Sequence, residues 1–139
     1  MRMLNNILLF LFLVSVGQWS NYALSHADHD KARFVSPDGI DIGKCDKPEK
    51  PCKTVSYAGL KSNKGDKILL SEGNYVIDDA DTLFYLLSDL VPIEGSYSKS
   101  SNYIERSDSN ITRLIGVPLE FADKLAEKGF TVVVDSKGL

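Results

Sequence analysis

Short apolar runs separated by turn-forming residues dominate the chain after residue 33. These runs are rich in Val, Ile, Leu and aromatic residues, which is typical of β-strands. Turn signals such as Ser36-Pro-Asp-Gly39 separate them, because Pro fixes φ and Gly accepts a positive φ. The strands that this pattern predicts are Phe34–Val35, Ile68–Leu70, Tyr75–Ile77, Leu90–Ile93, Ile111–Ile115 and Phe130–Val134.

Three segments instead have the pattern of helices. Thr54–Lys61 fits a short helix, and Thr82–Leu87 fits a second one with Asp81 as its N-cap. The clearest helix is Pro118–Lys128, where Pro118 suits the first helical position and Gly129 the residue after the C-cap. Within this helix we expect Phe121, Ala122 and Leu125 to face the core.

The predicted strands recur at a nearly constant spacing. Their centres lie near Leu69, Pro92, Leu114 and Val133, roughly 20 residues apart, a period that is typical of stacked coils in a solenoid. Helices also alternate with the strands, which favours an ordinary α/β fold. Spacing alone leaves both interpretations open.

The N-terminal segment has the layout of a secretory signal peptide. Arg2 is followed by an apolar run, Ile7–Val16, and then by small residues near Ala23, Ser25 and Ala27. The run has about half the length of a membrane-spanning helix. We expect residues 1–27 to be removed, with cleavage after Ser25 as the alternative. A flexible lead-in at 28–33 and one module at 34–139 would remain, secreted, periplasmic or at the cell surface, with no membrane span.

The charge of the chain limits the classes of partner, and the spacing of its two cysteines indicates how they are used. The chain has 19 acidic and 16 basic residues and a formal net charge of −3, which argues against nucleic acid as a partner. Cys45 and Cys52 lie in one polar loop, and in an exported chain this spacing predicts a local disulfide. A metal pair or a redox pair is the alternative, but neither matches the spacing of known motifs.

An acidic cluster is the candidate metal site. Asp78, Asp79 and Asp81 could supply carboxylate oxygens to Ca²⁺. The same residues fit a helix start, because Asp81 would serve as a cap. We expect no other cofactor.

A second candidate site surrounds the serine-rich segment 98–110. Tyr97 and Tyr103 flank this loop and Arg106 lies within it, a combination that could contact a carbohydrate ring. Tyrosines at the margin of a core would look the same. The only histidines, His26 and His29, precede the folded part, so no Ser-His-Asp triad is expected.

A family resemblance rests on the order of motifs from Phe34 to Tyr75. The chain reads F-V-S-P-D-G, then P-C-K-T at 51–54, then G-D-K-I-L-L and S-E-G-N-Y. This order resembles the opening of right-handed parallel β-helix (pectin-lyase-like) surface proteins. The motifs H-A-D-H-D-K-A-R-F-V and D-T-L-F-Y-L-L resemble most the choice-of-anchor B type of bacterial exported protein. The resemblance implies a mainly β fold, the start of a right-handed parallel β-helix with a cap helix and one or two inserted helices.

The function expected from these observations is a non-enzymatic exported module with a structural or adhesive role that binds a carbohydrate or another cell-surface component. A secreted polysaccharide-active lyase or hydrolase is the alternative. A small secreted α/β domain that binds a protein partner is the third interpretation. The last predicted strand is the most β-branched, and its open edge predicts self-association or truncation of a longer protein.

Overall fold

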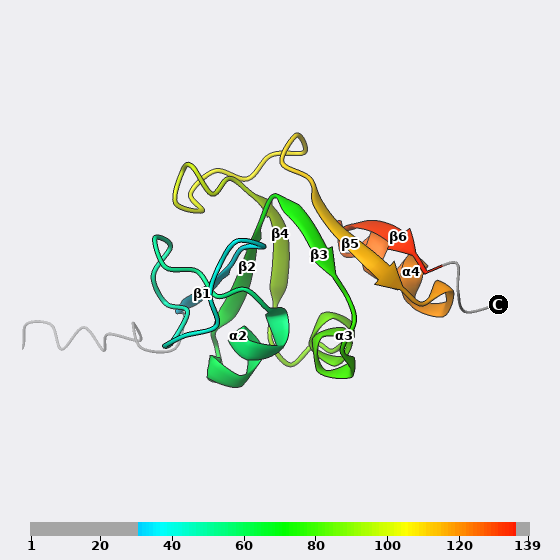
Figure 1. Ribbon diagram of the computed structural model, residues 1–139, viewed down its shortest axis with the longest axis horizontal. Coiled ribbons are helices and arrows are strands. Elements are labelled where there is room, and N and C mark those ends of the chain that lie inside the picture. Colours follow the sequence, from blue (N-terminus) through cyan, green and yellow to red (C-terminus); the bar gives the residue numbers. More distant parts are fainter. Residues whose placement is uncertain (1–30, 136–139) are drawn as a thin grey trace, which may run out of the picture.

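Within residues 31–135, six strands form two three-stranded sheets in which every neighbouring pair is parallel (Figure 1). The computed structural model describes residues 31–135. Sheet A has the order β1-β2-β4, with bounds β1 (Ala32–Val35), β2 (Lys67–Ser71) and β4 (Ile93–Tyr97). Sheet B has the order β3-β5-β6, with bounds β3 (Gly73–Val76), β5 (Thr112–Val117) and β6 (Thr131–Val134).

The described residues also form three helices, which lie in the connections between strands, because parallel pairing requires long crossovers. They are α2 (Val55–Lys61), α3 (Ala80–Leu87) and α4 (Leu119–Glu127). The chain order is β1-α2-β2-β3-α3-β4-β5-α4-β6. The described part of the chain is therefore a mixed α/β structure, in agreement with the α/β alternative; it is less dominated by strands than the main prediction.

The two sheets meet at a bend between β2 and β3. Only Glu72 separates these strands, and each then pairs with a strand of the next segment, Ile68 with Ile93 and Tyr75 with Leu114. The hydroxyl of Thr112 holds the corner, because it donates to the Ser71 carbonyl at 2.9 Å and accepts from the Ser96 N–H at 2.8 Å.

The spacing suggested that the strands near residues 69, 92, 114 and 133 form one stack. They do not. The first two belong to sheet A and the last two to sheet B. The predicted strand Leu90–Ile93 is also displaced, because β4 begins at Ile93 and includes the turn-forming residues Gly95 and Ser96. Its turn-like sequence reflects a local irregularity: Ser96 has φ of 69° and the β2–β4 register shifts between Leu69 and Ser71.

Two helix starts differ from the prediction by one or two residues. The N-cap of α3 is Asp79, whose carboxylate accepts from the Thr82 N–H at 2.6 Å, whereas Asp81 lies in the first turn. Pro118 is the N-cap of α4 rather than its first helical residue. The core prediction for α4 is confirmed at Leu125, which is buried, and Phe121 packs against the core from the side.

The Cys45–Cys52 disulfide is confirmed, and its loop covers the outer edge of β1. The Phe34 N–H donates to the Cys45 carbonyl at 2.7 Å, and the Cys52 N–H donates to the Phe34 carbonyl at 2.9 Å. The disulfide thereby holds in place a segment that provides hydrogen-bond partners for the main chain at the outer edge of β1. None of the helices in residues 31–135 combines the length and apolar character needed to cross a membrane.

Candidate functional site

A groove of about 500 Å³ lies between β3 and the segment that leads into α2. We call it the β3 groove. One wall is the segment 74–79 with Thr82, and the other is Pro37 with the segment 53–55. These residues are far apart in the sequence, which is why sequence patterns did not identify the site.

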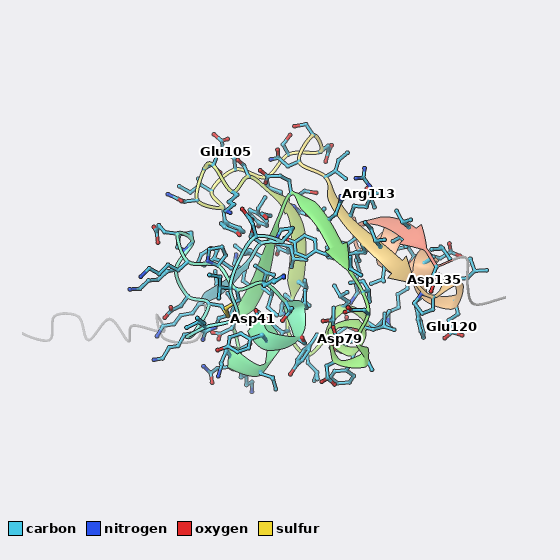
Figure 2. All side chains as sticks on the ribbon, viewed as in Figure 1. Asp41, Asp79, Glu105, Arg113, Glu120 and Asp135 are labelled. Atoms are coloured by element: carbon cyan, nitrogen blue, oxygen red, sulfur yellow. A yellow bond between two sulfur atoms is a disulfide. The ribbon has the colours of Figure 1, made fainter. Side chains whose placement is uncertain are left out.

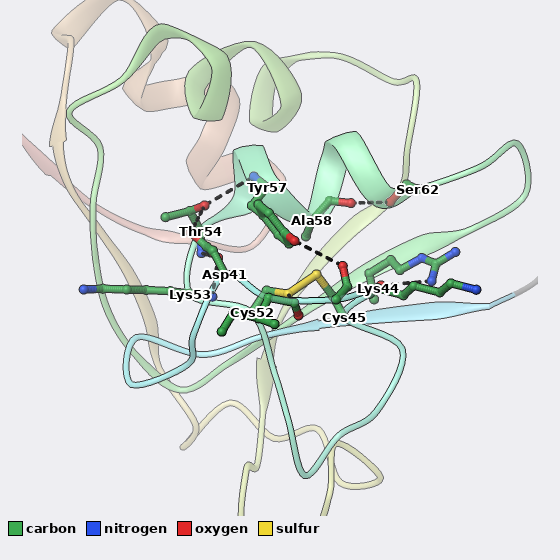
Figure 3. The surroundings of a disulfide bond; sticks show 12 residues. Asp41, Lys44, Cys45, Cys52, Lys53, Thr54, Tyr57, Ala58 and Ser62 are labelled. Carbon is green, nitrogen blue, oxygen red and sulfur yellow. Dashed lines mark hydrogen bonds between the residues drawn. A yellow bond between two sulfur atoms is a disulfide. The ribbon is translucent and has the colours of Figure 1, made fainter.

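The walls of the β3 groove are fixed by side chain to main chain hydrogen bonds (Figure 3). Asp41 accepts from the Lys53 and Thr54 N–H groups at 2.7 and 2.9 Å, and from the Thr54 hydroxyl at 2.8 Å. Thr54 in turn caps α2 by accepting from the Tyr57 N–H at 3.2 Å. Such local bonds set the groove shape before any ligand binds.

The groove combines hydrogen-bonding groups with apolar surface. Lys53, Asn74 and Asp78 contribute an ammonium, an amide and a carboxylate, while Val76 is 64% exposed. The amide oxygen of Asn74 accepts from Arg113 Nη1 at 3.0 Å, which orients its NH₂ group. A small number of oriented polar groups beside apolar walls is the usual composition of a small-molecule site. None of these residues was singled out by its own sequence signal except Asp78.

The acidic cluster is not gathered into a metal site. Within residues 31–135, no group of three or more His, Cys, Asp or Glu side chains is close enough to hold a metal ion. Asp78 and Asp79 both line the β3 groove, whereas Asp81 does not. The carboxylate of Asp79 also caps α3. Asp41 and Asp79 appear on the side of the molecule where α2 and α3 lie (Figure 2).

The structure does bring Tyr97, Tyr103 and Arg106 together. The ring centroids of Tyr97 and Tyr103 are 6.5 Å apart, and the guanidinium of Arg106 lies 5.9 Å from the Tyr97 ring centroid. The Tyr97 hydroxyl donates to Glu94 Oε2 at 2.6 Å. Burial and this bond to Glu94 together raise the pKa of Tyr97 to about 12.

Each of these three residues also has a structural role. Tyr103 is only 4% exposed, its ring lies 5.0 Å from that of Phe34, and its hydroxyl donates to the Val35 carbonyl at 2.9 Å. Burial raises the pKa of Tyr103 to about 12. Arg106 Nε donates to the Gly95 carbonyl at 2.9 Å. Tyr97 and Arg106 therefore retain surface for a ligand, whereas Tyr103 offers almost none.

A buried ion pair that the sequence analysis missed lies at the other end of sheet A. Arg33 is 3% exposed, and its Nε and Nη2 donate to Asp66 Oδ2 at 3.0 and 2.6 Å. Burial opposes ionisation of Asp66, but the Asn63 N–H and the Arg33 guanidinium more than offset it and hold the pKa of Asp66 below its usual value. Asp66 belongs to the G-D-K-I-L-L motif, which the sequence analysis used only for the family resemblance.

The predicted signal peptide, residues 28–30 of the lead-in, His26 and His29 lie outside the described residues. Comparison with protein-family models, curated proteins and solved structures finds no match to this chain. The resemblance to β-helix surface proteins therefore remains an expectation from the motifs.

Proposed function

We propose that this chain is a non-catalytic exported module that begins a right-handed parallel β-helix and binds a carbohydrate in the β3 groove. The observation that carries the proposal is the β3 groove itself: an amide, an ammonium and a carboxylate beside exposed apolar side chains, on loops fixed by Asp41 and Asp79. Saccharides present hydroxyl groups and apolar ring faces together, and this lining offers a partner to each.

Repetition of the sheet pattern supports the β-helix part of the proposal. The pair β2 and β3 is followed by the pair β4 and β5, and both strands of the second pair lie parallel to those of the first. One such pair per segment is what successive coils of a solenoid produce. The final pair, β5 and β6, is joined instead by α4 as in an ordinary βαβ unit.

The use of buried polar groups favours binding over catalysis. Arg33, Asp66, Tyr75 and Tyr103 have hydrogen-bond partners within the protein, and residues 31–135 contain no buried side-chain N or O atom without a partner. Strong burial raises the pKa of Tyr75, whose hydroxyl is held by Ser71 and the Val35 carbonyl. The Tyr75 and Tyr103 hydroxyls meet at the Val35 carbonyl, and the Arg33–Asp66 pair joins β1 to the turn before β2. Tyr75 lines the β3 groove, but its hydroxyl is already engaged in these internal hydrogen bonds.

Export and binding are tested on the full-length chain produced in a bacterial host. Mass spectrometry of protein from the periplasm and medium should show loss of residues 1–27, or of 1–25 if cleavage follows Ser25. The processed protein is then screened by affinity electrophoresis against neutral and uronate-containing polysaccharides. We expect retarded migration on at least one polysaccharide without release of reducing ends or unsaturated products.

Two sets of variants separate the candidate surfaces. Asn74→Ala and Asp78→Ala remove groups of the β3 groove, and Tyr97→Ala with Arg106→Ala alters the surface beside the serine-rich loop. We expect the groove variants to lose about tenfold or more in affinity, as each lost hydrogen bond to a ligand is worth about 1–1.5 kcal/mol. Retardation lost only in the Tyr97 and Arg106 variants would move the site there. Absence of retardation on every polysaccharide would contradict carbohydrate binding, and product release would support the enzyme alternative.

A further inference from the structure

Both edges of sheet A are covered by segments of the chain itself. The disulfide loop pairs with β1 through the Phe34 main chain. At the other edge, formed by β4, the Ser107 N–H donates to the Ser96 carbonyl at 3.1 Å, and Arg106 Nε donates to the Gly95 carbonyl. Covered edges prevent a sheet from pairing with another chain. Sheet A is therefore closed to strand addition.

Sheet B is not protected in the same way at β6. The β3 edge lies in the groove, where Pro37 comes so close to Gly73 that a Cβ there would lie 2.8 Å from Pro37 Cγ. The β6 strand has β5 as its only neighbour among the residues that the structure describes. The Asp135 N–H points toward β5, because it donates to the Val117 carbonyl at 3.0 Å. The direction of main-chain N–H and C=O groups alternates from residue to residue along a strand, so those of Val132 and Val134 point to the open side of β6.

The side chains of β6 are apolar on both faces of the sheet. Val133 is 41% exposed and lies next to Ile115 and Val76 in one cross-strand row on the outer face. On the inner face Val132 packs against the core, and Val134 is 36% exposed. A strand with exposed β-branched residues and a free row of N–H and C=O groups is a template for pairing.

From this arrangement we infer that two copies of the chain pair through β6 in an antiparallel manner, with the two-fold axis at Val133. In this register Val133 faces Val133 of the second copy, and Val132 faces its Val134. The open main-chain groups of Val132 and Val134 then form about four hydrogen bonds across the axis. Sheet B becomes a continuous six-stranded sheet, and the outer row of valines and isoleucines runs across both copies.

Charge agrees with this register. Thr131 of one copy faces Asp135 of the other, in the row that contains Arg113. Arg113 and Asp135 lie at opposite ends of their parallel strands (Figure 2), so an antiparallel copy brings unlike charges into one row and opposes no like charges. The contact is isologous and closes at two copies. Since it joins single strand edges, the dimer is weak and depends on concentration.

Cysteine cross-linking with a matched control tests the register. Val133→Cys places two thiols on the axis, where the Cα atoms of a non-hydrogen-bonded antiparallel pair approach to about 4.5 Å, within disulfide range. Val76→Cys is the control, because Val76 is in the same row, is more exposed and lies at the opposite edge of the sheet. We expect a reducible dimer of the purified full-length Val133→Cys protein under mild oxidation, and none of Val76→Cys.

Sedimentation measures the same contact without cysteines. Over about 10 µM to 1 mM, the wild type should shift from monomer to dimer, and Val133→Lys should raise the dimer Kd about tenfold by opposing two ammonium groups. Val76→Lys should leave the Kd unchanged. The inference is overturned if the wild type stays monomeric throughout, or if Val76→Cys cross-links as fast as Val133→Cys.

Discussion

Arg33 and Asp66 form a buried ion pair that ties β1 to the turn preceding β2. Arg33 Nη2 lies 2.6 Å from Asp66 Oδ2, and the two side chains are 4% and 0% exposed. Arg33 Nη1 also donates to the Lys44 carbonyl, and Asp66 accepts from the Asn63 N–H. The pair thus joins the first strand to the start of the disulfide loop, 11 residues away, and to the turn that starts the second strand, 33 residues away.

The first prediction concerns removal of one charge of this pair. Asp66→Asn keeps the shape of the side chain but leaves the Arg33 guanidinium buried without a counter-ion. We expect the free energy of unfolding to fall by about 3–5 kcal/mol in urea titrations. Asp108→Asn is the control, because Asp108 is exposed in the serine-rich loop, and should change it by less than about 0.5 kcal/mol. Equal stability of the two variants would contradict the role of the pair.

The same pair predicts acid sensitivity. The pKa of Asp66 is lowered in the folded protein, so its contribution to stability is complete above the unfolded value of about 3.9 and is lost as pH falls through the folded pKa. Lys99 and Ser36 lower the pKa of Asp38 to about 2, but this carboxylate is largely exposed and water screens it. Urea titrations between pH 5 and 2 should show a decline in stability that Asp66→Asn largely removes and Asp38→Asn does not.

Local structure could be predicted from the sequence, whereas the division into two sheets could not. The runs at 68–70, 111–115 and 131–134 mark strands because they are rich in the apolar and β-branched residues that are typical of strands. Whether a strand joins sheet A or sheet B depends on the bend at Glu72 and on pairing with strands far along the chain, such as Ile68 with Ile93 and Tyr75 with Leu114. The β3 groove could not be predicted from the sequence for the same reason, because its walls come from three separate segments.

The third prediction concerns the disulfide. Its loop of eight residues, closed by Cys45 and Cys52, should contribute about 2–3 kcal/mol by limiting the unfolded chain. Reduction should lower the urea midpoint of the wild type and leave a Cys45→Ser/Cys52→Ser variant unchanged. Since the loop also covers the β1 edge, hydrogen exchange at the Ser36 and Phe34 amides should become faster after reduction. Unchanged exchange there would show that the loop stays paired without the bond.

Neighbouring aspartates provide a matched test of the α3 cap. Asp79 accepts from the Thr82 N–H, whereas Asp81 lies two residues further on, in the first turn of α3, and is exposed. Asp79→Ala should therefore cost about 1 kcal/mol and Asp81→Ala only a few tenths, the size of a helix-dipole contribution. Thermal or urea unfolding separates the two. The reverse order would restore Asp81 as the cap that sequence alone suggested.

The last prediction concerns alkaline pH and Tyr103. Its pKa is raised to about 12 by burial, so the neutral hydroxyl stabilises the fold fully below the unfolded pKa of about 10. This contribution is lost as pH rises from about 10 toward 12, the same window as for Tyr97. In Tyr103→Phe the Val35 carbonyl still accepts a hydrogen bond from the Tyr75 hydroxyl. The substitution should therefore lower the free energy of unfolding at pH 7 by only about 1 kcal/mol. The variant should then lose less stability than the wild type between pH 9 and 11.5. Parallel pH curves for the two proteins would mean that the Tyr103 hydroxyl ionises in the folded protein as readily as in the unfolded chain.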